Sequence, residues 1–261
     1  MRICGVSVKG RGGITIVELM LALMAVGILS GIAWKASTAV IALSTNSRIT
    51  LEISRLNDAV EAFCSQFGDY PPDFRDSVSL AKFYKRRFPQ CPAANYPDPT
   101  GQSPASALYF WLAGPKGQGF STDPNNPFGK GGTRIGPFYK FTPDQLKKVD
   151  GVMQYFPPRG IDGAPYVYFR GGVNGYDGHP GWPPVKPYRS STDGSWIYGT
   201  TYQILCPGCD GKYGAGNHYP GGADYDAANL DDMANFAQGS TMAQMKEDAA
   251  KDAASKLSKK R

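Results

Sequence analysis

The pattern of apolar and polar residues divides the N-terminal quarter of the chain into two kinds of helix. Residues 14–34 form one apolar run, ITIVELMLALMAVGILSGIAW, in which Glu18 is the only charged residue. A helix of this length measures about 31 Å, close to the thickness of a bilayer's hydrocarbon core. Because its faces are apolar all round, it is not typical of a helix on the surface of a globular domain. The run predicts a transmembrane helix.

After Lys35 the helical pattern continues without a breaker, but the apolar residues now occupy one side. They recur three or four residues apart, which indicates a one-sided stripe on a helix. The stripe consists of Ile49, Ile53, Leu56, Val60, Phe63 and Phe67. Gly68 and Pro71-Pro72 end it, so one helix of about 80 Å is expected over residues 14–67. A coiled-coil seam is an alternative, and burial of the 35–67 stem against a globular domain is the simpler interpretation.

The following segment, residues 68–239, predicts a soluble body of short elements. It is rich in Gly, Pro, Tyr and Phe, which indicates many turns. Proline-initiated helices are expected up to Ala113 and over residues 146–148. Strands are expected at Val152–Phe156, Tyr166–Arg170 and Trp196–Leu205. The expected fold class is α+β, with a long N-terminal transmembrane and stem helix packed on a small antiparallel sheet with extended loops. Residues 240–261 form a charged tail, either a short solvated helix or disordered.

Residues 1–13 form a short basic leader with Arg2, Lys9 and Arg11. No Ala-x-Ala site follows the apolar run, which is also longer than a typical secretory signal. A positive leader favours a cytoplasmic N-terminus, so the rest of the chain is expected to face outward. Without the leader the net charge of +6 falls to about +3, which gives no nucleic-acid footprint.

Glu18 is the unusual residue of the apolar run. A carboxylate in a spanning helix costs on the order of 3 kcal/mol at mid-depth and less near an end. Glu18 lies near the start of the run, so one interpretation is that it reaches the headgroups. The alternative is functional: cleavage after Gly13 would give Ile14 a free amine, and Ile14 and Glu18 are i and i+4 on one helix face.

The segment Gly12-Gly13 followed by Ile14-Thr15-Ile16-Val17-Glu18 closely resembles the type IV prepilin signal. The resemblance implies cleavage after Gly13 by a prepilin peptidase, N-methylation of Ile14, and alignment of subunits by Glu18 during assembly. Ile14 departs from the commoner phenylalanine, and the mid-helix proline of many relatives is absent. The layout from Tyr70-Pro71-Pro72 onward resembles more loosely the major pseudopilin of type II secretion.

The resemblance implies a structural, non-enzymatic subunit of a type IV pilus-like or type II secretion pseudopilus filament. Its expected partners are copies of itself, other pilin-like subunits, the prepilin peptidase, the inner-membrane assembly machinery and membrane lipid, without nucleic acid. The expected location is the bacterial inner membrane as a single-pass protein, with the body outside the cytoplasm, and then the filament. The alternative is a membrane-anchored extracytoplasmic module that binds a glycan or surface polymer. An anchored enzyme is disfavoured, since no catalytic constellation is convincing.

Four cysteines would remain after cleavage: Cys64, Cys91, Cys206 and Cys209. An even number in an exported domain indicates disulfides, with three connectivities open. Cys206 and Cys209 form a CPGC motif, but it follows a strand and lacks a second CxxC, so redox and zinc interpretations are weak. Structural disulfides are expected, with Cys206–Cys209 and Cys64–Cys91 as one pairing.

An Asp- and Asn-rich segment follows the cysteines. Clustered acidic and amide side chains in a glycine-rich loop can supply the oxygen ligands that calcium prefers. A polar loop with helix-capping aspartates is the simpler interpretation. The pseudopilin resemblance implies a calcium loop whose candidate ligands are Asp231, Asp232 and, at the turn Asp210-Gly211, Asp210. Calcium is therefore a candidate cofactor.

The aromatic residues of the body allow one further hypothesis. Trp182, Tyr188 and Trp196 could form a sugar-binding platform, which would suit the binding-module alternative. Packing among turns is the simpler expectation, because aromatic side chains dominate core burial.

Overall fold

The computed structural model describes residues 15–158, 162–221 and 224–258. By their internal contacts, the residues divide into two units, Met1–Leu43 and Ser44–Arg261. The helix α1 (Ile16–Phe67) has residues in both units. Its end agrees with the prediction, because Gly68 follows with a φ of 71° and donates its N–H to the carbonyl of Cys64 at 2.6 Å.

The expected fold class was wrong in its transmembrane stem. Among the residues that the structure describes, no helix combines the length and the apolar character needed to cross a membrane. The expected single-pass location in the bacterial inner membrane is contradicted by the same finding. The α+β character of the expected fold is found, with small sheets and short helices in the second unit.

The second unit is organised around an antiparallel sheet with the order β5-β7-β9. The strands β5 (Val167–Arg170) and β7 (Tyr202–Cys206) pair with Val167 opposite Leu205, and β9 (Met233–Ala234) pairs with Cys206 and Leu205. Side chains alternate between the two faces, as the pleat requires. Both faces are buried, so the sheet separates two hydrophobic clusters.

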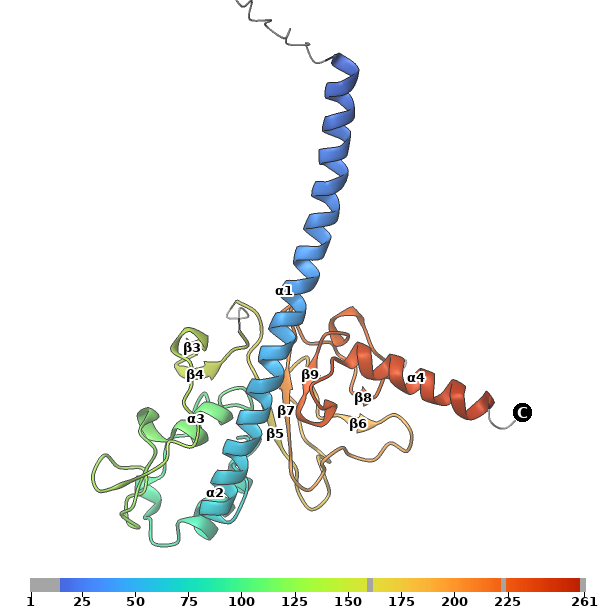
Figure 1. Cartoon of the computed structure of the whole chain (residues 1–261). Coiled ribbons are helices and arrows are strands. Elements are labelled where there is room, and N and C mark those ends of the chain that lie inside the picture. Colours follow the sequence, from blue (N-terminus) through green and yellow to red (C-terminus); the bar gives the residue numbers. More distant parts are fainter. Residues whose placement is uncertain (1–14, 159–161, 222–223, 259–261) are drawn as a thin grey trace, which may run out of the picture. The chain divides into compact units, whose positions relative to one another are not determined.

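The second half of α1 covers one face of this sheet. Its predicted stripe is buried from Ile49 to Phe63 together with the sheet residues Tyr168 and Ile204, and Phe67 is half-buried. Burial against a domain is thus confirmed as the role of the stripe. The helices α2 (Ser77–Arg87) and α3 (Ala107–Ala113) complete this cluster with Phe83 and Trp111. Figure 1 shows this part of α1 beside β5 and β7.

The opposite face of the sheet is covered by loops and by the C-terminal segment. Val167, Phe169 and Leu205 point into this second cluster. The helix α4 (Met242–Ser258) begins there with Met242, which is fully buried. The segment expected to be a charged tail is therefore helical over most of its length and attached to the body at its start (Figure 1).

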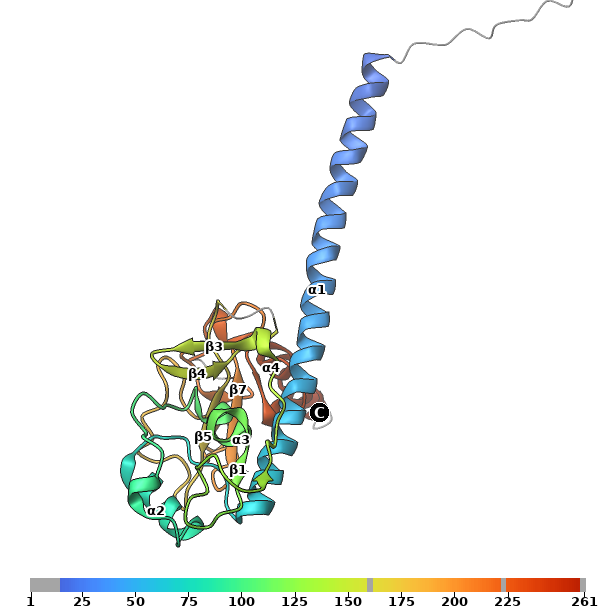
Figure 2. The ribbon, with the colours of Figure 1, turned by 90° about the vertical axis from the view of Figure 1, so that its left-hand side faces the viewer.

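The helix expected over residues 146–148 was wrong. Pro143 begins only a single 3₁₀ turn, η3 (Pro143–Gln145), and the chain then forms the hairpin of β3 (Leu146–Val149) and β4 (Val152–Tyr155), labelled in Figure 2. Asp150 and Gly151 connect the strands with φ of 49° and 87°. An Asp-Gly pair with positive φ at both positions favours a tight hairpin, and this local signal overrides the proline.

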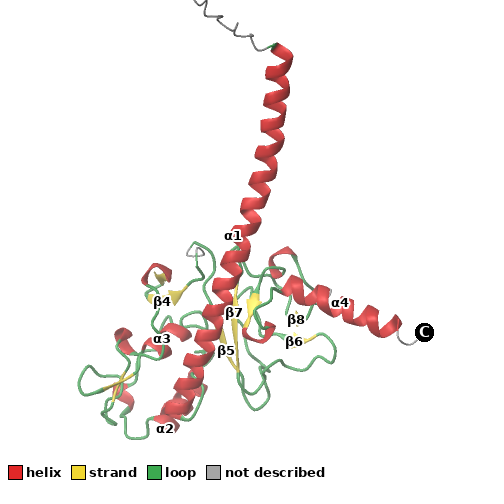
Figure 3. Ribbon diagram, in the orientation of Figure 1, coloured by secondary structure: helices red, strands yellow, loops and turns green. Residues whose placement is uncertain are grey.

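The other strand expectations were partly right. The strand expected over Trp196–Leu205 forms only from Tyr202, since Trp196–Thr201 is a turn region. Much of the body is loop, as Figure 3 shows. The remaining short elements are β1 (Phe120–Ser121), β2 (Arg134–Ile135), β6 (Arg189–Ser190), β8 (His218–Tyr219), η1 (Ala93–Asn95), η2 (Pro115–Gly117), η4 (Ala227–Asn229) and η5 (Asn235–Ala237).

Candidate functional site

The start of α1 is closed by a reciprocal pair of hydrogen bonds between Thr15 and Glu18. The hydroxyl Oγ1 of Thr15 accepts from the N–H of Glu18 at 3.2 Å. The Glu18 carboxylate accepts from the backbone N–H and the hydroxyl of Thr15, both at 3.3 Å. This is a capping box, which satisfies N–H groups at a helix start. The predicted processing residues Gly13 and Ile14 lie outside the described residues.

The first unit carries an extensive exposed apolar surface. We call it the N-terminal apolar surface, and it consists of Ile16, Val17, Leu19, Met20, Leu21, Leu23, Met24, Val26 and Ile28. Their exposed fractions range from 54% for Leu19 to 78% for Ile16. Because successive helical residues are rotated by about 100°, this run presents apolar groups on all sides of the helix. Apolar surface of this extent indicates an interaction site.

The aspartates proposed for calcium instead hold a turn together. The carboxylate of Asp231 accepts from the N–H groups of Cys209 at 2.7 Å and Asp210 at 2.9 Å. Asp210 in turn accepts from the N–H of Lys212 at 2.7 Å. Both side chains are thus occupied by backbone donors of the loop after β7.

Asp232, the third proposed ligand, is a buried carboxylic acid. Its Oδ2 accepts from Gly214 and Asn229, while its Oδ1 is buried without a hydrogen-bond partner in the described structure. Burial, with the charge of Asp231 nearby, raises the pKa of Asp232 to about 9, so the group is neutral at pH 7. Calcium requires six to eight oxygen ligands. Within the described residues, no three His, Cys, Asp or Glu side chains are grouped to hold a metal ion. The calcium site therefore stays a prediction.

The cysteines do not form the expected disulfides. Cys64, Cys91 and Cys206 are free thiols, so neither Cys206–Cys209 nor Cys64–Cys91 is joined in the structure. Cys206 ends β7 and points into the core, and burial raises its pKa well above the usual value. Cys209 lies beyond the turn, where its Sγ donates to Oδ1 of Asn46 at 3.0 Å. The two members of the CPGC motif thus have different surroundings.

The three aromatic residues proposed as a sugar platform are not open to a ligand together. Tyr188 is buried in the second cluster, with 3% exposure. The guanidinium of Arg189 lies 3.4 Å from the centre of the Trp196 ring and covers that face. Trp182 packs against Tyr213 and the second cluster. Core and turn packing is therefore confirmed as their arrangement.

A buried carboxylate on α1, Glu52, was not among the residues predicted from the sequence. Glu52 is only 9% exposed. It accepts hydrogen bonds from the hydroxyls of Tyr155 and Tyr166, the latter at 2.7 Å, and from the amide of Gln145 at 3.1 Å. Neutral donors from β4, from the residue before β5 and from η3 thus satisfy the carboxylate. The helical spacing of Glu52 does not indicate this burial.

A second missed group surrounds Asp69, which follows α1. Its carboxylate forms ion pairs with Arg170 on β5 and with Arg86 and Arg87 on α2, at 3.2 and 3.4 Å for the latter two. Burial raises the pKa of Asp69, but the guanidiniums, first of all that of Arg170, outweigh this and lower it below its usual value. The group links three elements of the body through one carboxylate.

Asp73 forms a neighbouring buried centre. Its Oδ2 contacts Nε2 of His179 at 2.7 Å and accepts from the N–H of Arg170 at 2.8 Å, and its Oδ1 accepts from the N–H of Arg75 at 3.2 Å. The side chains of Asp73 and His179 are 3% and 0% exposed. The contact between His179 and Asp73 thus connects the loop of His179 to the segment before α2.

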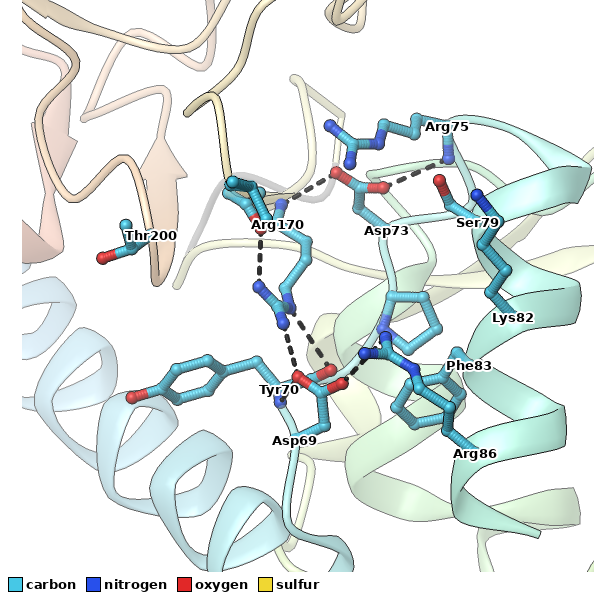
Figure 4. Close-up of a pocket in the computed structure, with 14 residues that line it drawn as sticks. Asp69, Tyr70, Asp73, Arg75, Ser79, Lys82, Phe83, Arg86, Arg170 and Thr200 are labelled. Atoms are coloured by element: carbon cyan, nitrogen blue, oxygen red, sulfur yellow. Dashed lines mark hydrogen bonds and ion pairs between the residues drawn. The ribbon is translucent and has the colours of Figure 1, made fainter. Parts of the chain in front are cut away.

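Asp69 and Asp73 form part of the lining of a cavity of about 340 Å³. The cavity lies between the end of α1, the α2 helix, and the chain after β5 (Figure 4). Its cationic side chains are Arg75, Lys82, Arg86 and Arg170. No local sequence pattern indicates this site, because its residues are spread over more than a hundred positions.

Comparisons with protein-family models, with curated proteins and with solved structures find no match to this chain. The function is therefore inferred from the residues and their geometry.

Proposed function

We propose that the protein is a non-enzymatic, type IV pilin-like filament subunit that assembles through the first half of α1. The observation that carries the proposal is the N-terminal apolar surface, which has large apolar side chains exposed on all sides of one helix. Its proposed partners are the same surfaces of other copies. A pilus-like or pseudopilus filament places such helices side by side in its centre.

The hydrophobic effect supports this arrangement energetically. Burying a Leu, Ile, Val or Met side chain completely contributes about 1.5–3 kcal/mol. Several such residues per helix would outweigh the cost of association when each helix is surrounded by neighbours. A single pairwise contact would cover one face only, so a helix that is apolar all round favours a multi-helix bundle.

Glu18 has a proposed second role beside capping. Cleavage between Gly13 and Ile14 by a prepilin peptidase would leave a free amine one residue before Thr15, to be N-methylated on Ile14. The Glu18 side chain is exposed where it accepts from Thr15. A neighbouring copy could therefore present its Ile14 amine to this carboxylate, so that the charges set the register of packing.

The test separates the charge of Glu18 from its capping. In Glu18→Gln the capping geometry is retained, because Gln also serves in a capping box, whereas the charge is lost. We expect Glu18→Gln and Glu18→Ala both to abolish filaments in producing cells, as scored by electron microscopy and by cross-linking between copies. Glu247→Gln, which alters an exposed glutamate of α4, should assemble normally.

Two results would contradict the proposal. Normal filaments from Glu18→Gln, with none from Glu18→Ala, would show that Glu18 acts as a helix cap and that its charge is not needed for assembly. N-terminal sequencing of the assembled protein should begin at Ile14, and an intact Met1 would exclude processing as proposed.

A further inference from the structure

We infer that the cavity bounded by α2 and the chain after β5 is a binding site for an oxyanion, a carboxylate or phosphate group. The inference concerns the body alone and does not depend on filament assembly. Two observations support it. Cationic side chains line the cavity, and its two carboxylates are already bonded to groups of the protein.

The acidic groups of the cavity are saturated. Asp69 is occupied by three guanidiniums, and its side chain is 10% exposed. Asp73 is buried and accepts from two backbone N–H groups and contacts His179. Neither carboxylate is therefore open to a cation from solvent.

The cationic groups include side chains that remain available at the opening. Lys82 is exposed, and no hydrogen bond or ion pair joins it to the other residues drawn in Figure 4. Arg75 contacts Asp76 through its Nε at 3.5 Å, a weak pair with a partly exposed carboxylate. Figure 4 shows Arg75 and Lys82 near Asp73 and Ser79, while Arg86 and Arg170 converge on Asp69.

This arrangement suits a compact anion. Arg170 is fixed by Asp69 and by the carbonyl oxygens of Tyr70 and Gly171, so it contributes a positive potential from a rigid position. Lys82 and Arg75 can then donate charge-assisted hydrogen bonds to the incoming oxygens. A volume of about 340 Å³ lies at the small end of ligand sites, which favours one anionic group with a short attachment.

The ligand chemistry has two sources, a free small ion or an acidic group carried on a polymer. Equilibrium dialysis of the full chain at constant ionic strength would use inorganic phosphate, acetate and a uronic-acid oligosaccharide as separate probes. Saturable binding of phosphate or acetate supports a free ion as the ligand. Saturable binding of the oligosaccharide alone supports a polymer-borne carboxylate.

The matched variants are Lys82→Ala and Lys85→Ala, two exposed lysines of α2 of which only Lys82 lines the cavity. Lys82→Ala removes a charge-assisted hydrogen bond to the anion and should weaken binding by about tenfold. Lys85→Ala removes only a surface charge outside the cavity and should change binding by less than about twofold. Arg75→Gln provides a second variant that should also weaken binding. Absence of saturable binding by all three probes, or equal losses in the two lysine variants, would overturn the inference.

Discussion

The two halves of α1 show how one continuous helical sequence can serve two kinds of contact. In the first half, the large apolar side chains described over residues 16–28 and 40–43 are exposed, as with Leu23 at 63%. In residues 44–67, the apolar side chains of the stripe are buried or half-buried, as with Phe63 at 0%. The second half has polar residues on the remaining faces, whereas the first half has few. A one-sided stripe can be buried within the chain, whereas a surface that is apolar all round stays exposed in the single chain.

The two halves also differ in how they use a glutamate. Glu18 is exposed, and among the described residues its side chain bonds to Thr15, three residues away. Glu52 is buried and bonds to Tyr155 and Tyr166, more than a hundred residues away. The carboxylate in the first half thus bonds locally, and the one in the second half is part of the folded body.

The largest expected effect comes from cutting back one apolar residue in each half. Phe63 packs against Trp111, Phe120 and other rings, so Phe63→Ala should lower the free energy of unfolding by about 3–5 kcal/mol. Leu23→Ala should change it by less than about 0.5 kcal/mol, because that side chain is exposed. Urea unfolding followed by tryptophan fluorescence measures both. Equal losses would show that the two halves are not energetically distinct.

A smaller effect is expected from the glutamates. Glu52→Ala leaves two buried tyrosine hydroxyls without their acceptor, which should cost about 2–4 kcal/mol. Glu18→Ala should leave unfolding of the body unchanged within about 0.5 kcal/mol. Denaturation curves of the two variants give the comparison directly. A stable Glu52→Ala protein would mean that water replaces the carboxylate in the interior.

The sequence predicted the periodic features of this molecule well. The stripe from Ile49 to Phe67 predicted both a helix and its buried face, and Gly68 predicted its end. The strands around Val152 and Tyr166 followed from their apolar and aromatic residues. These signals are local, so spacing alone reveals them.

Features that depend on distant residues could not be predicted. Glu52 looks like any polar helix residue until Tyr155 and Tyr166 are placed beside it. Asp69 and Arg170 are a hundred positions apart and meet only in the folded chain. The expected disulfides are not formed for the same reason, because composition does not fix the distances between side chains.

Asp69, which follows the second half of α1, gives the stability of the body a pH dependence that can be predicted. Asp69→Asn should cost about 1–3 kcal/mol at neutral pH, since charge-assisted bonds to the arginines are lost. The pKa of Asp69 is lowered on folding, so this stability is present above the unfolded pKa of about 3.9 and is lost as the pH falls through the folded value. The difference in melting temperature between wild type and variant should therefore shrink below about pH 4. Asp144→Asn, which alters an exposed aspartate, serves as the control.

The smallest effect concerns the helix caps of the two units. Asp76 caps α2 by accepting from the N–H of Ser79 at 2.6 Å, and Thr15 caps α1 by accepting from Glu18. Asp76→Ala should lower the free energy of unfolding of the body by about 1 kcal/mol. Thr15→Ala removes a similar bond, but it should only speed hydrogen exchange at the first amides of α1, because the start of that helix is exposed to solvent. If Thr15→Ala destabilised the body as much as Asp76→Ala, the first half of α1 would have to share the stability of the folded domain.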